Sequence, residues 1–336
     1  MIFHGQRSLP VPATLGAVIA AVFAAVVVSQ PVEAREPKVV VTLKPVHALV
    51  SQIMDGAGKP VLIVEGSASP HTFTLKPSAA KAINEADLFI RISEGLEPFT
   101  RKVADALPPT VKLVSVADAP GVGFLVQRVG DTFEKHKHHE AGDGNHHDQD
   151  DIEDHDEDEA KDEAKDGHVW LDPQNAKAIV AEVARVLSDT YPENTAKFAS
   201  NAAAVTAKLD TLATDIATEL APVKDKPFIV FHDATQYFER RFGVHAAGSV
   251  TVSPDVQPSA KRLTAVRKKI ASLGAVCVFA EPEFQPNLVA AVTEGTKARS
   301  GTIDPEGQFL TPGPDLYFDL MRGMAHNLRA CLGAGP

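Results

Sequence analysis

The stretch that decides the fold is residues 192–221, PENTAKFASNAAAVTAKLDTLATDIATELA, which ends just before Pro222. Its apolar residues recur at steps of three or four, and this spacing predicts one buried helix face: Phe198, Ala202, Val205, Leu209, Leu212, Ile216 and Leu220. At 1.5 Å per residue this helix would span roughly 40 Å, the size of a domain. We expect residues 191–222 to be a connecting strut between two lobes. A coiled-coil seam is disfavoured, because the stripe is alanine-rich and lacks flanking charge pairs.

On the N-terminal side of this helix, short apolar runs alternate with helical patterns. Strands are expected at residues 38–43 (KVVVTL), 61–65, 87–92 (DLFIRI) and 111–116. Helices are expected from Pro45 onward and at residues 77–86, 97–107 and 173–190. The last of these has the start signal of an N-capping Asp172 followed by Pro173.

The C-terminal side repeats the alternation. Strands are expected at residues 227–231 (PFIVF), 244–250, 275–280 (AVCVFA) and 300–303, and helices at 235–242, 258–272, 286–298 and 314–332. Strand–helix alternation builds βαβ units and mainly parallel sheets. The sequence therefore predicts an α/β fold with two lobes, residues 35–190 and 223–336, each a mainly parallel sheet flanked by helices.

Residues 1–34 have the features of a secretory signal peptide. Arg7 supplies a positive charge, and residues 15–28 are apolar and uncharged. This run is shorter than the ~20 residues that a membrane-spanning helix needs, which disfavours a retained membrane anchor. The motif VEA at residues 32–34 predicts cleavage after Ala34 and an exported, soluble mature protein.

The two cysteines, Cys277 and Cys331, fit an oxidising compartment. An even pair in an exported chain predicts a disulfide, with two buried thiols as the alternative. Neither cysteine lies in a CxxC motif, so both are poor candidates for zinc ligands.

The charge of the chain is concentrated in an insert. The formal net charge of −11 argues against nucleic acid as a partner, since a phosphate backbone demands basic patches. Much of the acidity lies in residues 135–166, which are too poor in apolar side chains to fold by themselves, so we expect a mobile loop. Its histidines are candidate ligands for weak, non-essential zinc binding, with a solvated acidic loop whose histidines are incidental as the alternative: His136, His138, His139, His146, His147 and His155.

Three further histidines, His71, His168 and His232, stand far apart, each just past an expected strand or a short connection. Two carboxylates also follow expected strands: Asp304 comes after residues 300–303, and Glu281 after residues 275–280. Ligands of open α/β sheets bind at the carboxyl ends of strands. A cleft between the lobes would bring the three imidazoles and Asp304 together as a tetrahedral zinc site. Glu281 is a candidate for orienting a ligand imidazole, or an ordinary strand-end carboxylate.

Four stretches in this order carry a resemblance to a known family: EGSASPHTFTLKPSAAKAINEADLF, HVWLDPQNA, FIVFHDATQYFERRFGV and GTIDPEG. The chain resembles the periplasmic zinc-binding proteins of bacterial ABC importers, which have two α/β lobes and a rigid connecting helix. The resemblance implies that His71, His168 and His232 are metal ligands and that Asp304 completes or closes the coordination sphere. It also implies a Cys277–Cys331 disulfide and delivery of Zn²⁺ to a membrane permease by a monomer in the periplasm.

One departure from the family pattern concerns the fourth ligand. Some relatives carry an acidic residue immediately before the first histidine, where this chain has Pro70. This leaves Asp304 or a water as the fourth ligand. Related manganese receptors carry a carboxylate at the position of His232; imidazole suits zinc and harder oxygen ligands suit Mn²⁺, so the sequence favours zinc over manganese.

Other classes are disfavoured on motifs. A zinc hydrolase would also use three histidines, but the chain has neither HExxH nor GxSxG, so we expect no enzyme activity. A surface adhesin that holds a structural metal is a third possibility. The soluble export signal and the lack of repeats count against it.

Overall fold

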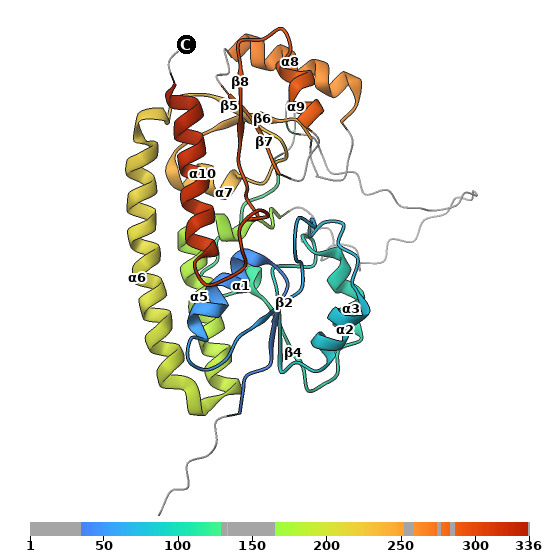
Figure 1. The fold of residues 1–336 in the computed structure, drawn as a ribbon, viewed down its shortest axis with the longest axis vertical. Coiled ribbons are helices and arrows are strands. Elements are labelled where there is room, and N and C mark those ends of the chain that lie inside the picture. Colours follow the sequence, from blue (N-terminus) through green and yellow to red (C-terminus); the bar gives the residue numbers. More distant parts are fainter. Residues whose placement is uncertain are drawn as a thin grey trace, which may run out of the picture. The chain divides into compact units, whose positions relative to one another are not determined.

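The chain forms two separate four-stranded parallel sheets (Figure 1). The structure is a computed structural model that describes residues 35–128, 133, 165–251, 258–273, 277–282 and 286–334. Both sheets are flanked by helices, which confirms the predicted fold class. The predicted signal peptide, residues 1–34, and the six histidines of the insert lie outside the described residues.

The first sheet has the strand order β2-β1-β3-β4. Its strands are β1 (Val39–Val41), β2 (Val61–Leu62), β3 (Leu88–Arg91) and β4 (Lys112–Ser115), and its helices are α1 (Lys44–Ile53), α2 (Pro77–Asn84) and α3 (Arg101–Asp105). The chain goes from β1 to β2 on one side and then crosses to β3 on the other. The carboxyl ends of β1 and β3 therefore border a topological switch point, where ligands of such sheets bind.

The second sheet repeats this topology, with the order β6-β5-β7-β8. Its strands are β5 (Phe228–Val230), β6 (Ala246–Ser249), β7 (Cys277–Ala280) and β8 (Arg299–Thr302), and its helices are α7 (Gln236–Phe242), α8 (Ala260–Leu273), α9 (Pro286–Thr293) and α10 (Leu316–Gly333). Helix α7 ends at Gly243, whose φ of 69° is the left-handed conformation that favours glycine at a helix end. The equivalent switch point lies between β5 and β7.

The long helix predicted from the apolar stripe is α6 (Thr195–Leu220), flanked by 3₁₀ turns at Pro192–Asn194 and Ala221–Val223. The large side chains of the stripe are buried and Ala202 is partly buried. Helix α6 packs against α1 and α5 (Pro173–Thr190), and also against α10 and α7 (Figure 1). It thus joins helices that follow the first sheet to helices that follow the second.

One apolar core runs from the first sheet to the second. It includes Val39 of β1, Leu49 of α1, Leu209 of α6 and Phe279 of β7. The opposite faces of the two sheets have separate smaller cores, covered by α2 and α3 in one case and by α8 and α9 in the other. Because the central core is shared, the boundaries 35–190, 191–222 and 223–336 remain a prediction.

Many predicted elements are shorter in the structure, among them two helices and strand β2. The helix expected at 97–107 is a 3₁₀ turn, Pro98–Thr100, followed by the five-residue α3. The helix expected at 286–298 ends at Thr293, because Gly295 takes a φ of 72°. Strand β2 is only Val61–Leu62, although the amides of Ile63 and Val64 still bond to the carbonyls of Val41 and Thr42.

The predicted disulfide is confirmed. Cys277 in β7 is bonded to Cys331 in α10, across a sequence separation of 54 residues. Closing a loop of this length would stabilise the fold by about 4 kcal/mol in the chain-entropy model. None of the helices in the described ranges is long and apolar enough to span a bilayer.

Candidate metal centre

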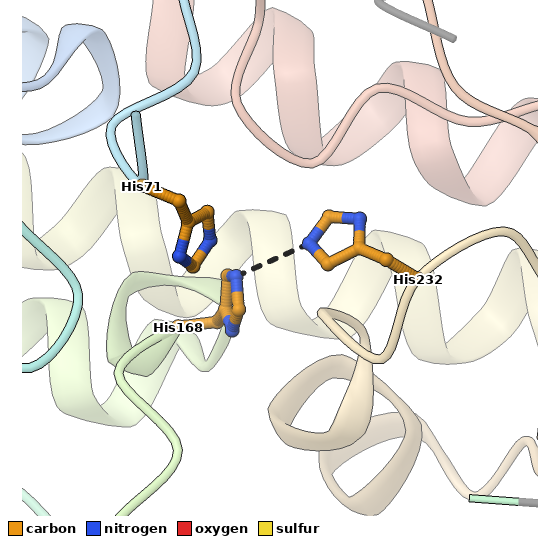
Figure 2. Close-up of side chains that lie close together, drawn as sticks. All are labelled: His71, His168 and His232. Atoms are coloured by element: carbon orange, nitrogen blue, oxygen red, sulfur yellow. Dashed lines mark hydrogen bonds between the residues drawn. The ribbon is translucent and has the colours of Figure 1, made fainter. Parts of the chain in front are cut away.

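Three histidines that are distant in sequence gather at one point (Figure 2). His71 lies in the loop between β2 and α2, His168 just before the 3₁₀ turn Val169–Leu171, and His232 just after β5. One ring nitrogen from each lies within 4.8 Å of the others. Three imidazoles in this arrangement are a ligand set that Zn²⁺ accepts in proteins.

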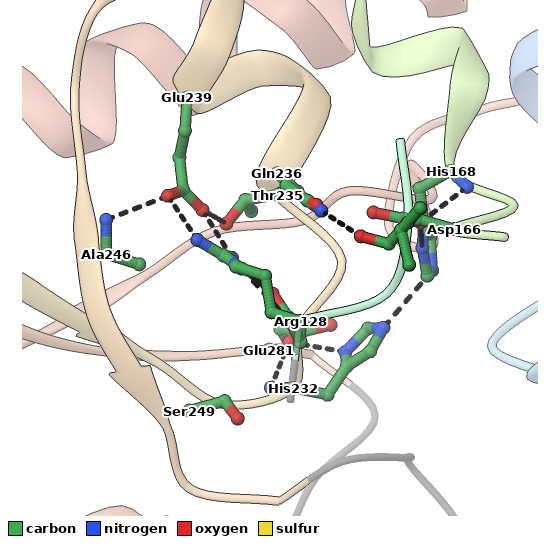
Figure 3. Close-up of polar contacts among 12 residues, drawn as sticks. Arg128, Asp166, His168, His232, Thr235, Gln236, Glu239, Ala246, Ser249 and Glu281 are labelled. Atoms are coloured by element: carbon green, nitrogen blue, oxygen red, sulfur yellow. Dashed lines mark hydrogen bonds and ion pairs between the residues drawn. The ribbon is translucent and has the colours of Figure 1, made fainter. Parts of the chain in front are cut away.

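His168 and His232 form the tighter pair. Their Nε2 atoms are 3.4 Å apart, and both side chains are buried. The Nδ1 atom of His168 lies 2.7 Å from Oδ1 of Asp166, and that of His232 lies 2.7 Å from Oε1 of Glu281 (Figure 3). Each carboxylate oxygen also accepts the backbone N–H of its own histidine, at 3.0 Å in both cases. Each histidine is therefore fixed to one oxygen by two hydrogen bonds, one from its ring and one from its backbone.

This arrangement determines which nitrogen is available to a metal. An ionised carboxylate only accepts, so the proton of each neutral ring belongs on Nδ1 and the lone pair on Nε2. Two lone pairs that face each other in a buried place call for a cation or a proton between them. Nitrogens bound to one tetrahedral zinc at the usual bond length are about 3.3 Å apart, close to the separation of this pair.

His71 is placed more loosely. It is partly exposed, and its backbone N–H donates to the hydroxyl of Ser69 at 3.3 Å. Its ring centroid is 5.8 Å from that of His168 and 6.1 Å from that of His232, whereas the paired rings are 5.3 Å apart. Its nitrogen lies within 4.8 Å of the other two, so a shift of up to roughly 1.5 Å would bring it to a zinc-ligand spacing.

The segment that carries His168 is bonded to residues of the second half of the chain. Trp170 is fully buried, and its indole N–H donates to the carbonyl of Pro305 at 2.9 Å. The hydroxyl of Tyr317 in α10 donates to the carbonyl of Trp170 at 2.8 Å. The hydroxyl of Tyr237 in α7 donates to the carbonyl of Asp166 at 2.7 Å. His168 and His232 are therefore held on one framework, although 64 residues separate them.

Gly167 allows the close approach behind His168. A Cβ at this position would lie 2.8 Å from Cβ of Leu96, which is shorter than real contacts of this kind. A glycine here lets the backbone before His168 pack directly on the loop that follows β3.

An ion-pair cluster holds the turn after His232. Arg128 donates to both oxygens of Glu239, at 2.8 and 2.9 Å, and to both oxygens of Asp233 (Figure 3). Glu239 also accepts from the hydroxyl of Thr235 at 2.6 Å and from the amide of Ala246 at 2.9 Å. Burial raises the pKa of Asp233, and the charge of Arg128 opposes this rise. The cluster fixes the turn that begins at His232.

Asp304 does not belong to the cluster of three histidines. Its carboxylate accepts the backbone N–H of Gln308 at 2.9 Å and that of Phe309 at 3.3 Å, so it caps its own loop after β8. The structure thus brings together three of the four residues that the sequence proposed as ligands.

The carboxylate partner of His168 is one that the sequence did not indicate. Asp166 was expected at the end of a mobile, solvated loop, yet it is only 4% exposed. An acidic residue two positions before a candidate ligand was the available signal. Glu281, by contrast, lies beside the ring of His232, which fits the first of the two roles that the sequence left open for it.

Known proteins match this chain along most of its length. The profile of the family described as "ZnuA: Zinc-uptake complex component A periplasmic" matches residues 39–331. The chain belongs to this family. It is 49% identical over 304 residues to the "High-affinity zinc uptake system protein ZnuA" of Brucella abortus (strain 2308), a match that covers 88% of this chain and 91% of that protein. The family is one of periplasmic solute-binding proteins, which is not a class of enzymes.

Solved structures confirm the fold. A structure described as "Crystal structure of ZnuA" superposes with a TM-score of 0.69 at 21% identity, over 88% of this chain and 98% of that one. The structure of a mutant of the laminin-binding adhesin (Lmb) from Streptococcus agalactiae also has a TM-score of 0.69 at 21% identity, over 88% of this chain and 99% of that one. At such low identity these matches establish the fold, not the ligand or the activity.

Proposed function

We propose that this chain is a periplasmic receptor that captures Zn²⁺ with His71, His168 and His232 and delivers it to the permease of an ABC importer. The observation that carries the proposal is the buried His168–His232 pair, whose Nδ1 atoms point at carboxylates and whose Nε2 atoms are 3.4 Å apart. Capture at nanomolar or lower zinc needs about 12 kcal/mol or more of binding free energy. Family membership and the 49% identical relative of Brucella abortus support zinc as the cargo.

Zinc is preferred over manganese because all three proposed ligands are imidazoles. Mn²⁺ suits carboxylate and carbonyl oxygens, whereas imidazole suits zinc. The same nitrogen set would also accept copper or nickel by raw affinity, so metal availability in the periplasm contributes to the selection. Another divalent metal is therefore the alternative cargo, and competition titrations distinguish it from zinc.

Asp304 remains the candidate for the fourth ligand, with water as the alternative. For Asp304 to bind zinc, its carboxylate would have to exchange the amides of Gln308 and Phe309 for the metal. An Asp304→Asn variant that binds zinc as tightly as the parent would favour water.

The histidines of the insert are proposed to collect zinc weakly. Flexible imidazoles and carboxylates bind weakly because ordering them costs entropy. Deleting residues 135–164, which keeps Asp166 at His168, should leave the tight site intact. Loss of tight zinc binding in this variant would refute the proposal that the tight site does not need the insert.

Export with cleavage after Ala34 is proposed from the sequence of residues 1–34. Mass spectrometry of protein recovered from a bacterial periplasm tests it: the mature chain should begin at Arg35.

The experiment that tests the proposed function is a calorimetric titration of the metal-free mature chain with Zn²⁺ and with Mn²⁺, at neutral pH. We expect one tight zinc site and much weaker manganese binding. A chain without a tight zinc site would defeat the proposal. Transfer of zinc to the permease in membrane vesicles tests the delivery step.

A further inference from the structure

Lys44, the first residue of α1, has its ammonium group buried at the carboxyl end of the first sheet. It is 5% exposed, and its Nζ donates to the carbonyls of Gly66 at 2.7 Å, Gln308 at 2.7 Å and Gly307 at 3.2 Å. An ammonium group has three donors, so these carbonyls satisfy all of them. Gly66 belongs to the loop that carries His71, whereas Gly307 and Gln308 belong to the loop that Asp304 caps.

The place of Lys44 in the fold matches that of His232. Lys44 follows β1 at the switch point of the first sheet, and His232 follows β5 at the switch point of the second. Burying an ammonium group is costly unless it is fully bonded. Burial lowers the pKa of Lys44, while the nearby charges of Asp304 and Glu306 act in the opposite direction. The cost of burying this ammonium group suggests that Lys44 has a specific role. Its three hydrogen bonds indicate what that role is.

We propose that Lys44 is a positioning residue that ties the His71 loop to the Asp304 loop and so holds His71 beside the His168–His232 pair. This inference rests on the proposed zinc-receptor function. Without the tie, the loop that carries His71 would be more disordered in the metal-free protein. Zinc binding would then have to order it, which weakens binding, and the bound ion would lose its third imidazole more often.

The test compares Lys44→Met, which keeps the length of the side chain and removes the donors, with Lys226→Met. Lys226 is a matched control because its Nζ also donates to a backbone carbonyl, that of Leu332 at 2.7 Å, in another part of the fold. Two quantities are measured on the mature full-length chain: hydrogen exchange of the metal-free protein, and the rate at which bound zinc is lost to a chelator.

For Lys44→Met we expect amide exchange in residues 63–76 and zinc loss both to rise by about tenfold or more, since a tenfold change needs only about 1.4 kcal/mol. Exchange should stay at the parent rate outside this loop and the loop of Gly307 and Gln308, which Lys44 also contacts. Lys226→Met should leave both rates unchanged. Lys44→Arg, which keeps the charge and the donors, should give rates between those of the parent and of Lys44→Met. Placed on a His71→Ala background, Lys44→Met should not speed zinc loss further.

Three results would overturn the proposal: parent-like exchange in residues 63–76, a uniform increase of exchange over the whole chain, or the same acceleration of zinc loss with His71 absent. The exchange measurement needs no zinc, so it judges the loop tie separately. A parent chain that fails to bind zinc would refute the receptor function and would leave the exchange result to stand by itself.

Discussion

The ligands of the candidate metal centre differ in how firmly the protein holds them. His168 and His232 are buried, and each ring is fixed by a carboxylate. The segment that carries His168 is bonded to α10 and to α7, the helix that begins just after His232. His71 is partly exposed and lies in a loop, with Ser69 bonded to its backbone. Two of the three candidate ligands are therefore held in place, and the position of the third depends on a loop.

The difference has a consequence for capture and release. A preformed pair binds a metal without first being ordered, so His168 and His232 can be the first side chains to bind Zn²⁺. In the proposed site His71 would then complete the ligand set, and the entropy of ordering its loop would reduce the gain in affinity. We expect His71 to be the first ligand to leave when the metal is handed on.

The largest expected effect comes from removing a member of the pair. His232→Ala should weaken zinc binding by more than about 1000-fold, which corresponds to about 4 kcal/mol, and His71→Ala by about 100-fold. Calorimetric or chelator-competition titrations measure both. His326→Ala is the control, since this histidine lies on α10 with its side chain 74% exposed. Equal losses of zinc affinity for His71→Ala and His232→Ala would contradict the claim that His71 contributes less to binding than the buried pair.

The next effect concerns the carboxylates that orient the pair. Glu281→Gln and Asp166→Asn keep the size of each side chain but remove the charge that holds Nδ1–H. Each should weaken zinc binding by about 10–100-fold, as such outer partners of metal-bound histidines do elsewhere. Glu294→Gln, which removes a charge from a side chain that is 80% exposed, should change nothing. Parent-like affinity in both variants would mean that the orienting bonds do not matter.

A smaller effect is expected from Gly167→Ala. The new Cβ would lie 2.8 Å from Cβ of Leu96, so the backbone before His168 must shift. We expect a loss of about 1–3 kcal/mol in stability, as for other overpacked sites, and weaker zinc binding. Leu96→Gly removes the Cβ that the new methyl group would meet. The Gly167→Ala change should therefore cost less stability in a Leu96→Gly background than in the parent. Equal penalties in the two backgrounds would rule out the steric cause.

The smallest expected effect is a pH dependence of stability that arises from Glu97, beside the first sheet. Glu97 accepts the amides of Ile92 and Ser93 after β3, and burial raises its pKa from 4.5 to about 7. Between these values the folded chain holds this proton more tightly than the unfolded chain. Its contribution to stability is therefore complete below about pH 4.5 and is lost as the pH rises through 7.

In Glu97→Gln this side chain no longer binds or releases a proton, so its contribution to the pH dependence of stability disappears. From pH 6 to pH 8 the metal-free parent should lose about 1 kcal/mol more stability than the variant does. Denaturant unfolding at both pH values measures the difference. Identical pH slopes for parent and variant would show that the Glu97 carboxyl does not titrate in this range.

Much of the fold could be predicted because its signals are local. The stripe from Phe198 to Leu220 predicts α6 by its spacing, and the Asp172-Pro173 pair predicts the start of α5, where the Asp172 side chain accepts the amide of Gln174 at 2.8 Å. Element ends were harder to predict. The short α3 and the early end of α9 depend on a 3₁₀ turn and on the backbone of Gly295, which apolar spacing does not report.

The site was predictable only in part because its remaining contacts are tertiary. Resemblance indicated the three histidines, but the bonds of Lys44 to Gly307 and Gln308 cross more than 260 residues and have no local pattern. Asp304 was expected at the metal, whereas its carboxylate caps the amides of its own loop, as short acidic side chains often do. For Asp166 the acidic neighbours in sequence indicate a place in the solvated insert, and only the fold brings its side chain to His168.

The most direct test of the central claim is a crystal structure of the zinc-loaded mature chain with anomalous data collected at the zinc edge. The account predicts one strong peak bound by a ring nitrogen of each of His71, His168 and His232, at about 2.0–2.1 Å. A tight zinc site elsewhere in the molecule, or a peak that lacks either His168 or His232, would contradict it.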